Sequence, residues 1–195
     1  MNRRSFLKWL LVGVAALTGG AGSVEAYRFI FPAQKAKSWP ITRVGNISSL
    51  STLRPITFNY PCSTGTPNIL VKLGTPAHNG VGPDKDIVAF SSLCQHLGCT
   101  LEFVPQGQAT PLGSQDIAQV SEGFCPCHPS VFDFVNAGNV ISGQSKYPLP
   151  QVILKYDEPT GDLYATALTP PNIFGRGPSG TMDLNLVMNY DLAGC

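Results

Sequence analysis

Two short stretches decide the fold of this chain: Cys94-Gln95-His96-Leu97-Gly98-Cys99 and Cys125-Pro126-Cys127-His128-Pro129-Ser130. Each pairs a cysteine with a histidine, as Cys-x-His in the first and Cys-x-x-His in the second, and each contains one further cysteine. Two thiolates and two imidazoles are ligands for a single zinc ion, or for a [2Fe–2S] cluster in which imidazoles replace the thiolates on one iron. The two stretches therefore indicate a metal site built from two loops.

The complete pattern, C-x-H-L-G-C followed by C-P-C-H-x-S, resembles that of Rieske iron–sulfur proteins. The resemblance implies a [2Fe–2S] cluster with two cysteines on the inner iron and two histidines on the outer iron: Cys94, Cys125, His96 and His128. It also implies a disulfide between Cys99 and Cys127 that links the two ligand loops. The alternative, a structural Cys2His2 zinc site, needs no third and fourth cysteine.

The resemblance assigns three further residues to tuning of the cluster: Leu97, Ser130 and Phe132. Neutral imidazole ligands make a cluster easier to reduce, with potentials of roughly −150 to +300 mV against about −400 mV for plant-type ferredoxins. Hydrogen bonds to the sulfurs adjust the potential, and Ser130 matches the hydroxyl residue that provides one in the family. Phe132 stands where quinol-oxidising members commonly carry tyrosine, so we expect a middling rather than a high potential.

Composition favours a single small β domain with an appendage. The 195 residues can bury a proper core. Charged residues make up 13% and the net charge is +1, so there is no electrostatic basis for binding nucleic acid. Twenty glycines and 17 prolines among short apolar runs favour turn-rich β structure. No catalytic residues are identified, and the chain itself is expected to carry electron transfer only.

Residues 1–31 are interpreted as an export signal. Asn2–Lys8 resembles the twin-arginine box, and the apolar stretch Trp9–Val24 follows it. An iron–sulfur protein assembled in the cytoplasm must cross the membrane already folded, which this route allows. An oxidising destination also preserves disulfides. We therefore expect a periplasmic location or one on the extracytoplasmic face of the membrane.

Two fates remain open for this segment. Val24-Glu25-Ala26 fits a small-residue cleavage site before Tyr27. If Phe6–Phe31 instead forms one helix, its length is about 39 Å, enough to cross a hydrocarbon core about 30 Å thick. We favour the retained membrane anchor.

The rest of the chain is divided into a linker (32–40), a Rieske domain (41–177) and a C-terminal extension (178–195). No stretch of the exported part has sustained helical periodicity, so we predict an all-β, antiparallel domain preceded by an N-terminal helix. The ligand loops, 94–99 and 125–130, form a small cluster-binding subdomain at one tip. Strands are expected at Ile41–Ile47, Pro55–Tyr60, Asn68–Leu73, Asp86–Ser91, Thr100–Val104, Val131–Val135, Gln151–Tyr156, Asp162–Leu168 and Asp183–Met188.

Outside the ligand loops, the sequence resembles the small subunit of arsenite oxidase. The similarity spans about residues 60–176 and includes residues with no role in cluster binding: Val71–Gly74, Gly80–Ser91, Leu149–Gln151 and Ile173–Arg176. In that family the position of Phe132 is also phenylalanine. The resemblance implies a subunit that passes electrons between a large catalytic subunit, with molybdopterin and another iron–sulfur cluster, and a cytochrome c or cupredoxin. Related molybdenum oxidoreductases, including iodate reductase, use a similar Rieske subunit, so the substrate stays open.

The alternative function is the Rieske subunit of a quinol-oxidising cytochrome bc-type complex. There His96 or His128 would accept a proton and a hydrogen bond from quinol, and Tyr147–Pro150 would be a proline loop covering the cluster. A Rieske ferredoxin that feeds an oxygenase does not fit the predicted export.

Three features have no assigned role in the cluster site. Residues 106–119 are a polar, turn-rich segment interpreted as a tolerated surface insertion, with a partner-binding loop as the alternative. Cys62 and Cys195 remain unassigned and could form a disulfide, stay as free thiols or bind separate partners. His78 lies in a turn-like segment and is interpreted as a loop residue.

Overall fold

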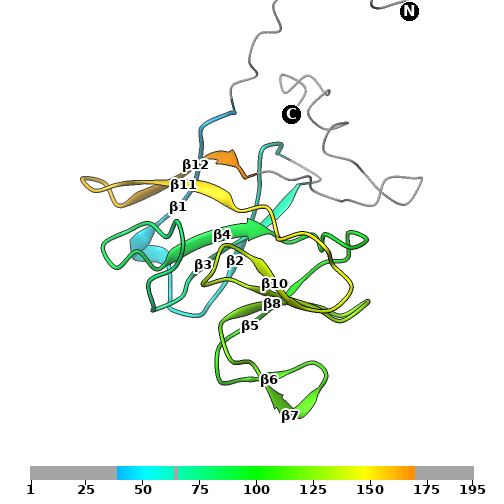
Figure 1. The fold of residues 1–195 in the computed structure, drawn as a ribbon. Helices are drawn as coiled ribbons and strands as arrows, with labels where there is room; N and C mark the ends of the chain where they lie inside the picture. Colours follow the sequence, from blue (N-terminus) through cyan, green and yellow to red (C-terminus); the bar gives the residue numbers. More distant parts are fainter. Residues whose placement is uncertain (1–38, 64–65, 170–195) are drawn as a thin grey trace, which may run out of the picture. The chain divides into compact units, whose positions relative to one another are not determined.

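The computed structural model describes residues 39–63 and 66–169 (Figure 1). In this part of the chain there are twelve strands and one short 3-10 helix, and every pairing between named strands is antiparallel. The predicted all-β, antiparallel class is confirmed. The predicted signal or anchor and the Asp183–Met188 strand lie outside the described residues. Among those that are described, no helix has the length and apolar content needed to span a bilayer.

The strands form three sheets and a separate hairpin. The first sheet has the order β1-β12-β11, with bounds Thr42–Asn46, Asp162–Leu168 and Val152–Asp157. The second has the order β2-β3-β4, with bounds Ile56–Asn59, Pro67–Lys72 and Ile87–Ser91. The third has the order β10-β9-β8-β5, with bounds Asn139–Ser142, Ser130–Asp133, Glu122–Cys125 and Glu102–Val104. The hairpin joins β6 (Ala109–Thr110) to β7 (Gly113–Ile117), and the 3-10 helix η1 (Ile47–Ser49) follows β1.

The second sheet is central because apolar side chains cover both of its faces. Successive side chains of a strand point to opposite faces. In β4, Ile87 and Ala89 join a core with residues of β11 and β12, whereas Val88 and Phe90 join a core with residues of the third sheet. All five residues of β4 are accordingly buried. A strand that is buried on both faces needs a continuous apolar run, which explains why Ile87–Phe90 does not alternate with polar residues.

Most predicted strands are present, and the differences come from contacts distant in sequence. The predicted strand Thr100–Val104 is shortened to β5, because Thr100 instead forms an isolated bridge with Leu93 across the base of the first ligand loop. Strand β10 was not predicted. It is mostly exposed and pairs with β9 through an irregular register between Val140 and Ser142, so its own sequence shows little alternation.

The insertion at residues 106–119 contains the hairpin β6–β7. The Thr110 hydroxyl donates to the Asp116 carboxylate at 2.5 Å, and the Gln106 side chain donates to the Gln119 carbonyl at 2.9 Å. All five residues of β7 are exposed, which agrees with a surface insertion. The hairpin leaves β5 and enters β8 at the Val104–Glu122 end of this strand pair, whereas Cys125 lies at the other end.

A pH dependence of stability is expected from Glu122, whose residue surface is only 4% exposed and which lies opposite Asp133 in the sheet register. Burial raises the pKa of Glu122, and the nearby Asp116 and Asp133 carboxylates raise it further. Because the folded pKa lies above the unfolded value, the charged carboxylate destabilises the fold once the pH exceeds the unfolded pKa. Glu122→Gln should therefore be more stable than the wild type at about pH 8, and the difference should shrink toward about pH 4. Thermal unfolding of both proteins across this range tests this, and equal stability at the higher pH would contradict it.

Candidate metal centre

Two loops between strands hold the predicted ligands. The first follows β4 and is closed by hydrogen bonds from the Cys94 amide to the Cys99 carbonyl and from the Gly98 amide to the Cys94 carbonyl, both 2.8 Å. Gly98 has a φ of +76°, a conformation that glycine adopts without steric cost. The second loop connects β8 to β9, and the register pair Cys125–Ser130 closes it. The sheet pairing therefore fixes the separation between the two strands that carry this loop.

The two predicted cysteine ligands lie together in the core. Cys94 is 0% exposed and Cys125 is 1% exposed, and both are free thiols whose side chains interact. Burial raises the pKa of Cys94 to about 12. The neighbouring Cys125 also raises this pKa, whereas the backbone amides of His96 and Leu97 lower it. A thiol in such surroundings stays neutral without a metal, but a bound cation deprotonates its thiol ligands. The pair therefore suits metal binding better than nucleophilic chemistry.

The two predicted histidine ligands lie farther out. The ring centroids of His96 and His128 are 4.8 Å apart, and the rings are perpendicular. His96 is half-buried and His128 is exposed. In the described part of the structure, Nδ1 of His96 is buried without a hydrogen-bond partner. Buried polar atoms normally have a partner, so this nitrogen is a good candidate for a metal ligand.

These four residues fit a binuclear cluster. The predicted ligands form a buried pair of thiols and an outer pair of imidazoles. A [2Fe–2S] cluster with two imidazole ligands takes two protein ligands on each iron, so each pair can serve one iron.

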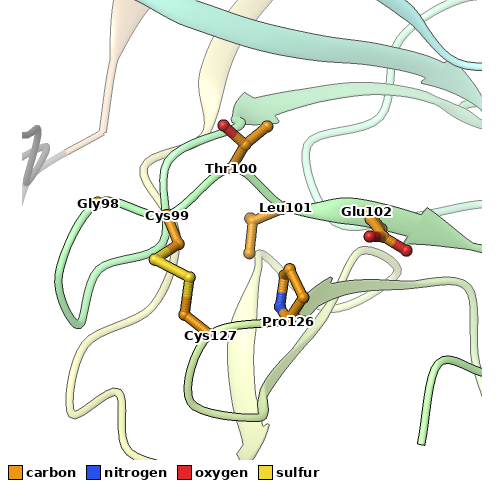
Figure 2. Close-up of a pocket in the computed structure, with 7 residues that line it drawn as sticks. All are labelled: Gly98, Cys99, Thr100, Leu101, Glu102, Pro126 and Cys127. Atoms are coloured by element: carbon orange, nitrogen blue, oxygen red, sulfur yellow. A yellow bond between two sulfur atoms is a disulfide. The ribbon is translucent and has the colours of Figure 1, made fainter.

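The predicted disulfide between Cys99 and Cys127 is present and joins the two ligand loops (Figure 2). The two Cα atoms are 6.5 Å apart, inside the usual range of about 4.4–6.8 Å for disulfides. The bridge borders a pocket that is lined by Gly98, Cys99, Thr100, Leu101, Glu102, Pro126 and Cys127. Cys99 is buried and Cys127 is exposed, so the bridge ties a surface loop to the core.

The three predicted tuning residues differ in their surroundings. The Ser130 hydroxyl is buried, donates to the His128 carbonyl at 3.1 Å and accepts from the amides of Gln144 and Ser145 at 3.0 Å. It has a single proton, so donation to a cluster sulfur would compete with the His128 carbonyl. Leu97 is 39% exposed on the first loop, whereas Phe132 is wholly buried in the core that contains both ligand cysteines. Their effects on the potential stay predictions.

Sequence reasoning gave too little weight to residues 144–151, which we call the covering segment. In this segment, the backbone amides of Gln144 and Ser145 donate hydrogen bonds to the Ser130 hydroxyl of the second ligand loop. Leu149 is 2% exposed and belongs to the same core as Cys94 and Cys125. Two signals point to this segment in the sequence: Tyr147–Pro150, interpreted as a proline loop in the alternative function, and Leu149–Gln151, expected beside the His96/His128 tip in the favoured one. The structure places this segment against the site independently of function.

The remaining candidate residues lie away from the ligand pairs or outside the described chain. His78 is an exposed loop residue, as interpreted, and its amide donates to the Val135 carbonyl at 2.8 Å. Cys62 is disulfide-bonded. Cys195 lies outside the described residues, so the pairing of Cys62 with Cys195 stays a prediction.

An antiparallel β scaffold with two cysteine–histidine loops joined by a disulfide defines a two-loop iron–sulfur domain. The Rieske [2Fe-2S] domain family matches residues 63–153 of this chain. The chain is 36% identical over 170 residues to iodate reductase subunit IdrB of Pseudomonas sp. (strain SCT), which covers 85% of this chain and 78% of that protein. The chain belongs to the Rieske [2Fe–2S] family.

Two further comparisons agree with this family. The crystal structure of the soluble domain of Rieske protein II (soxF) from Sulfolobus acidocaldarius has a TM-score of 0.60 and 30% sequence identity, and the match covers 78% of this chain and 89% of that one. The cytochrome bc1 complex Rieske iron-sulfur subunit of Streptomyces lividans is 30% identical over 90 residues, or 40% of this chain and 46% of that protein.

Proposed function

We propose that this chain is the Rieske electron-transfer subunit of an exported molybdenum oxidoreductase of the arsenite oxidase type. The similarity to an iodate reductase subunit supports this most, because it extends over 85% of the chain. The similarity to a cytochrome bc1 Rieske subunit extends over only 40%. The first similarity thus includes more of the chain outside the ligand loops, where members with different partners are free to diverge.

In this proposal the chain holds the cluster at the boundary between core and surface. Cys94 and Cys125 are the ligands of the inner iron, and His96 and His128 are the ligands of the outer iron. The bound [2Fe–2S] cluster supplies reversible one-electron transfer. The buried thiol pair excludes water from the inner side, whereas His128 presents an exposed imidazole edge to a partner. The Cys99–Cys127 disulfide joins the two ligand loops and so limits the movement of one loop relative to the other.

The proposed partner is a large catalytic subunit with molybdopterin, which converts an oxyanion. With arsenite as the donor, electrons leave through this chain to a cytochrome c or a cupredoxin. With iodate as the acceptor, as the name of the Pseudomonas relative suggests, electrons pass in the opposite direction. The same imidazole edge serves both directions, because one-electron transfer through it is reversible. Export by the twin-arginine route, with retention of residues 6–31 as an anchor, is part of the proposal.

Affinity purification of the tagged full-length chain from its native host tests the partner. We expect a large molybdenum-containing subunit to copurify in a fixed ratio. Arsenite should reduce the cluster, or iodate should oxidise the reduced cluster, only when that subunit is present. The isolated chain is the control, and it should respond to neither oxyanion.

The alternative is a subunit of a quinol-oxidising cytochrome bc-type complex, and the match to the Streptomyces lividans protein favours it. It requires copurification with cytochrome b and quinol-dependent reduction of the cluster that quinol-site inhibitors block. Those two results together would replace the first proposal.

A further inference from the structure

Gln151 ends the covering segment and connects it to a loop more than 70 residues away in sequence. The residue is 2% exposed. Its Nε2 donates to the His78 carbonyl at 2.9 Å, and its Oε1 accepts from Nδ2 of Asn79 at 3.0 Å. Both polar atoms of a buried amide are therefore used by one loop, and a shorter side chain at this position could not reach it.

Backbone hydrogen bonds also hold Gln151 and the residue before it in place. The Gln151 amide donates to the Thr169 hydroxyl at 2.8 Å, and the Thr169 amide donates back to the Gln151 carbonyl at 2.9 Å. The preceding Pro150 carbonyl accepts from the Ser91 amide at 2.9 Å, immediately before the first ligand loop. Gln151 thus joins β4, the end of β12 and the His78–Asn79 loop.

The other end of the covering segment contacts the second ligand loop. The Ser130 hydroxyl accepts the amides of Gln144 and Ser145, each at 3.0 Å. A side chain at Gly143 would collide with the Pro129 backbone, so this approach requires glycine. Between the two ends, Leu149 packs in the core that contains Cys94. The segment therefore extends from the second ligand loop to Gln151, and Lys146 and Tyr147 between these ends are exposed.

The His78–Asn79 loop is itself restrained. Asn79 has a φ of +55°, a left-handed conformation that is uncommon for residues other than glycine. Such a conformation persists when the surroundings hold it in place. The His78 amide is bound to the Val135 carbonyl at 2.8 Å, which leaves its own carbonyl directed to Gln151. This loop is a fixed support, so it can hold the end of a segment in one position.

We propose that Gln151 is a positioning residue for the cluster: it holds the covering segment against the second ligand loop and so controls solvent access to the outer ligand pair. The consequence for electron exchange rests on the function proposed above, whereas the positioning itself can be measured on the isolated chain. Without the Gln151 side-chain amide, the His78 carbonyl loses this donor, and the segment gains freedom at the end that Gln151 fixes.

The test compares Gln151→Ala with Asn46→Ala in the cluster-containing full chain. Asn46 is the matched control, because its side chain also joins distant segments, through the Thr160 carbonyl at 2.9 Å and Asp162 at 2.8 Å, but lies in the first sheet. In Gln151→Ala, hydrogen exchange at the Gln144, Ser145 and Leu149 amides should become about tenfold faster. Cluster bleaching should accelerate several-fold, and the reduction potential should shift. Asn46→Ala should lower global stability and leave these three readouts unchanged.

Asn79→Gly keeps the experiment decisive if Gln151→Ala does not fold, because it removes one of the two side-chain hydrogen bonds at an exposed residue, and glycine accepts the φ of +55° at this position. It should produce a smaller change of the same kind. Unchanged exchange at the three amides in the folded variant, or equal acceleration in Asn46→Ala, would overturn the proposal. Neither result depends on the partner subunit, so failure here is distinct from failure of the proposed function.

Discussion

His128→Ala protein is expected to lose the Rieske-type electron paramagnetic resonance signal entirely. His128 supplies half of the outer imidazole pair, 4.8 Å from His96 between ring centroids, and alanine offers no replacement ligand. The outer iron would then have a single protein ligand, so the cluster should not be retained. The measurement is the spectrum of the reduced protein, with iron content per chain determined in parallel.

His78→Ala is the matched control for this experiment. It removes the third histidine of the chain from an exposed loop and leaves the backbone contacts of that loop intact. Its signal and iron content should equal those of the wild type. A full signal in His128→Ala, or stoichiometric zinc without iron in wild-type protein matured in its native host, would contradict the ligand assignment.

The double variant Cys99→Ser/Cys127→Ser should be destabilised by about 3–4 kcal/mol. The bridge closes a loop with a sequence separation of 28, and the chain-entropy estimate for a loop of this length gives that amount. No ligand is removed, so the cluster should assemble but be lost faster, because the two ligand loops are no longer tied together. Chemical unfolding measures the first effect, and the decay of visible absorption measures the second.

Thr100→Ser is a suitable control for the bridge, because Thr100 lines the same pocket (Figure 2) and the bridge remains intact. Its stability and cluster lifetime should stay close to wild type. A double variant with wild-type cluster lifetime would show that β-sheet pairing alone holds the loops, and the structural role given to the disulfide would be wrong.

The hairpin β11–β12 was predictable because its signals are local. Alternating apolar residues on both sides of the Asp157–Gly161 turn are enough to define it, and β12 has the predicted bounds Asp162–Leu168. The hairpin β6–β7 and the strand β10 were not predicted. Both are short and mostly exposed, so burial imposes no alternation on their sequences. The pairing of β6, β7 and β10 depends on where the neighbouring strands end, which local sequence does not show.

The sequence by itself determined the donor chemistry, because two cysteines and two histidines at ligand spacing are a local property of Cys94–Cys99 and Cys125–Ser130. The resemblance to Rieske proteins implies that the cysteines are inner and the histidines outer, and the tertiary structure gives the reason, since burial of Cys94 and exposure of His128 depend on the packing of different sheets. Only the tertiary structure placed Gln151 against His78, across 73 positions. The partner of the Gln151 side-chain amide follows no local sequence pattern, because a hydrogen bond between distant segments depends on how the folded chain brings them together.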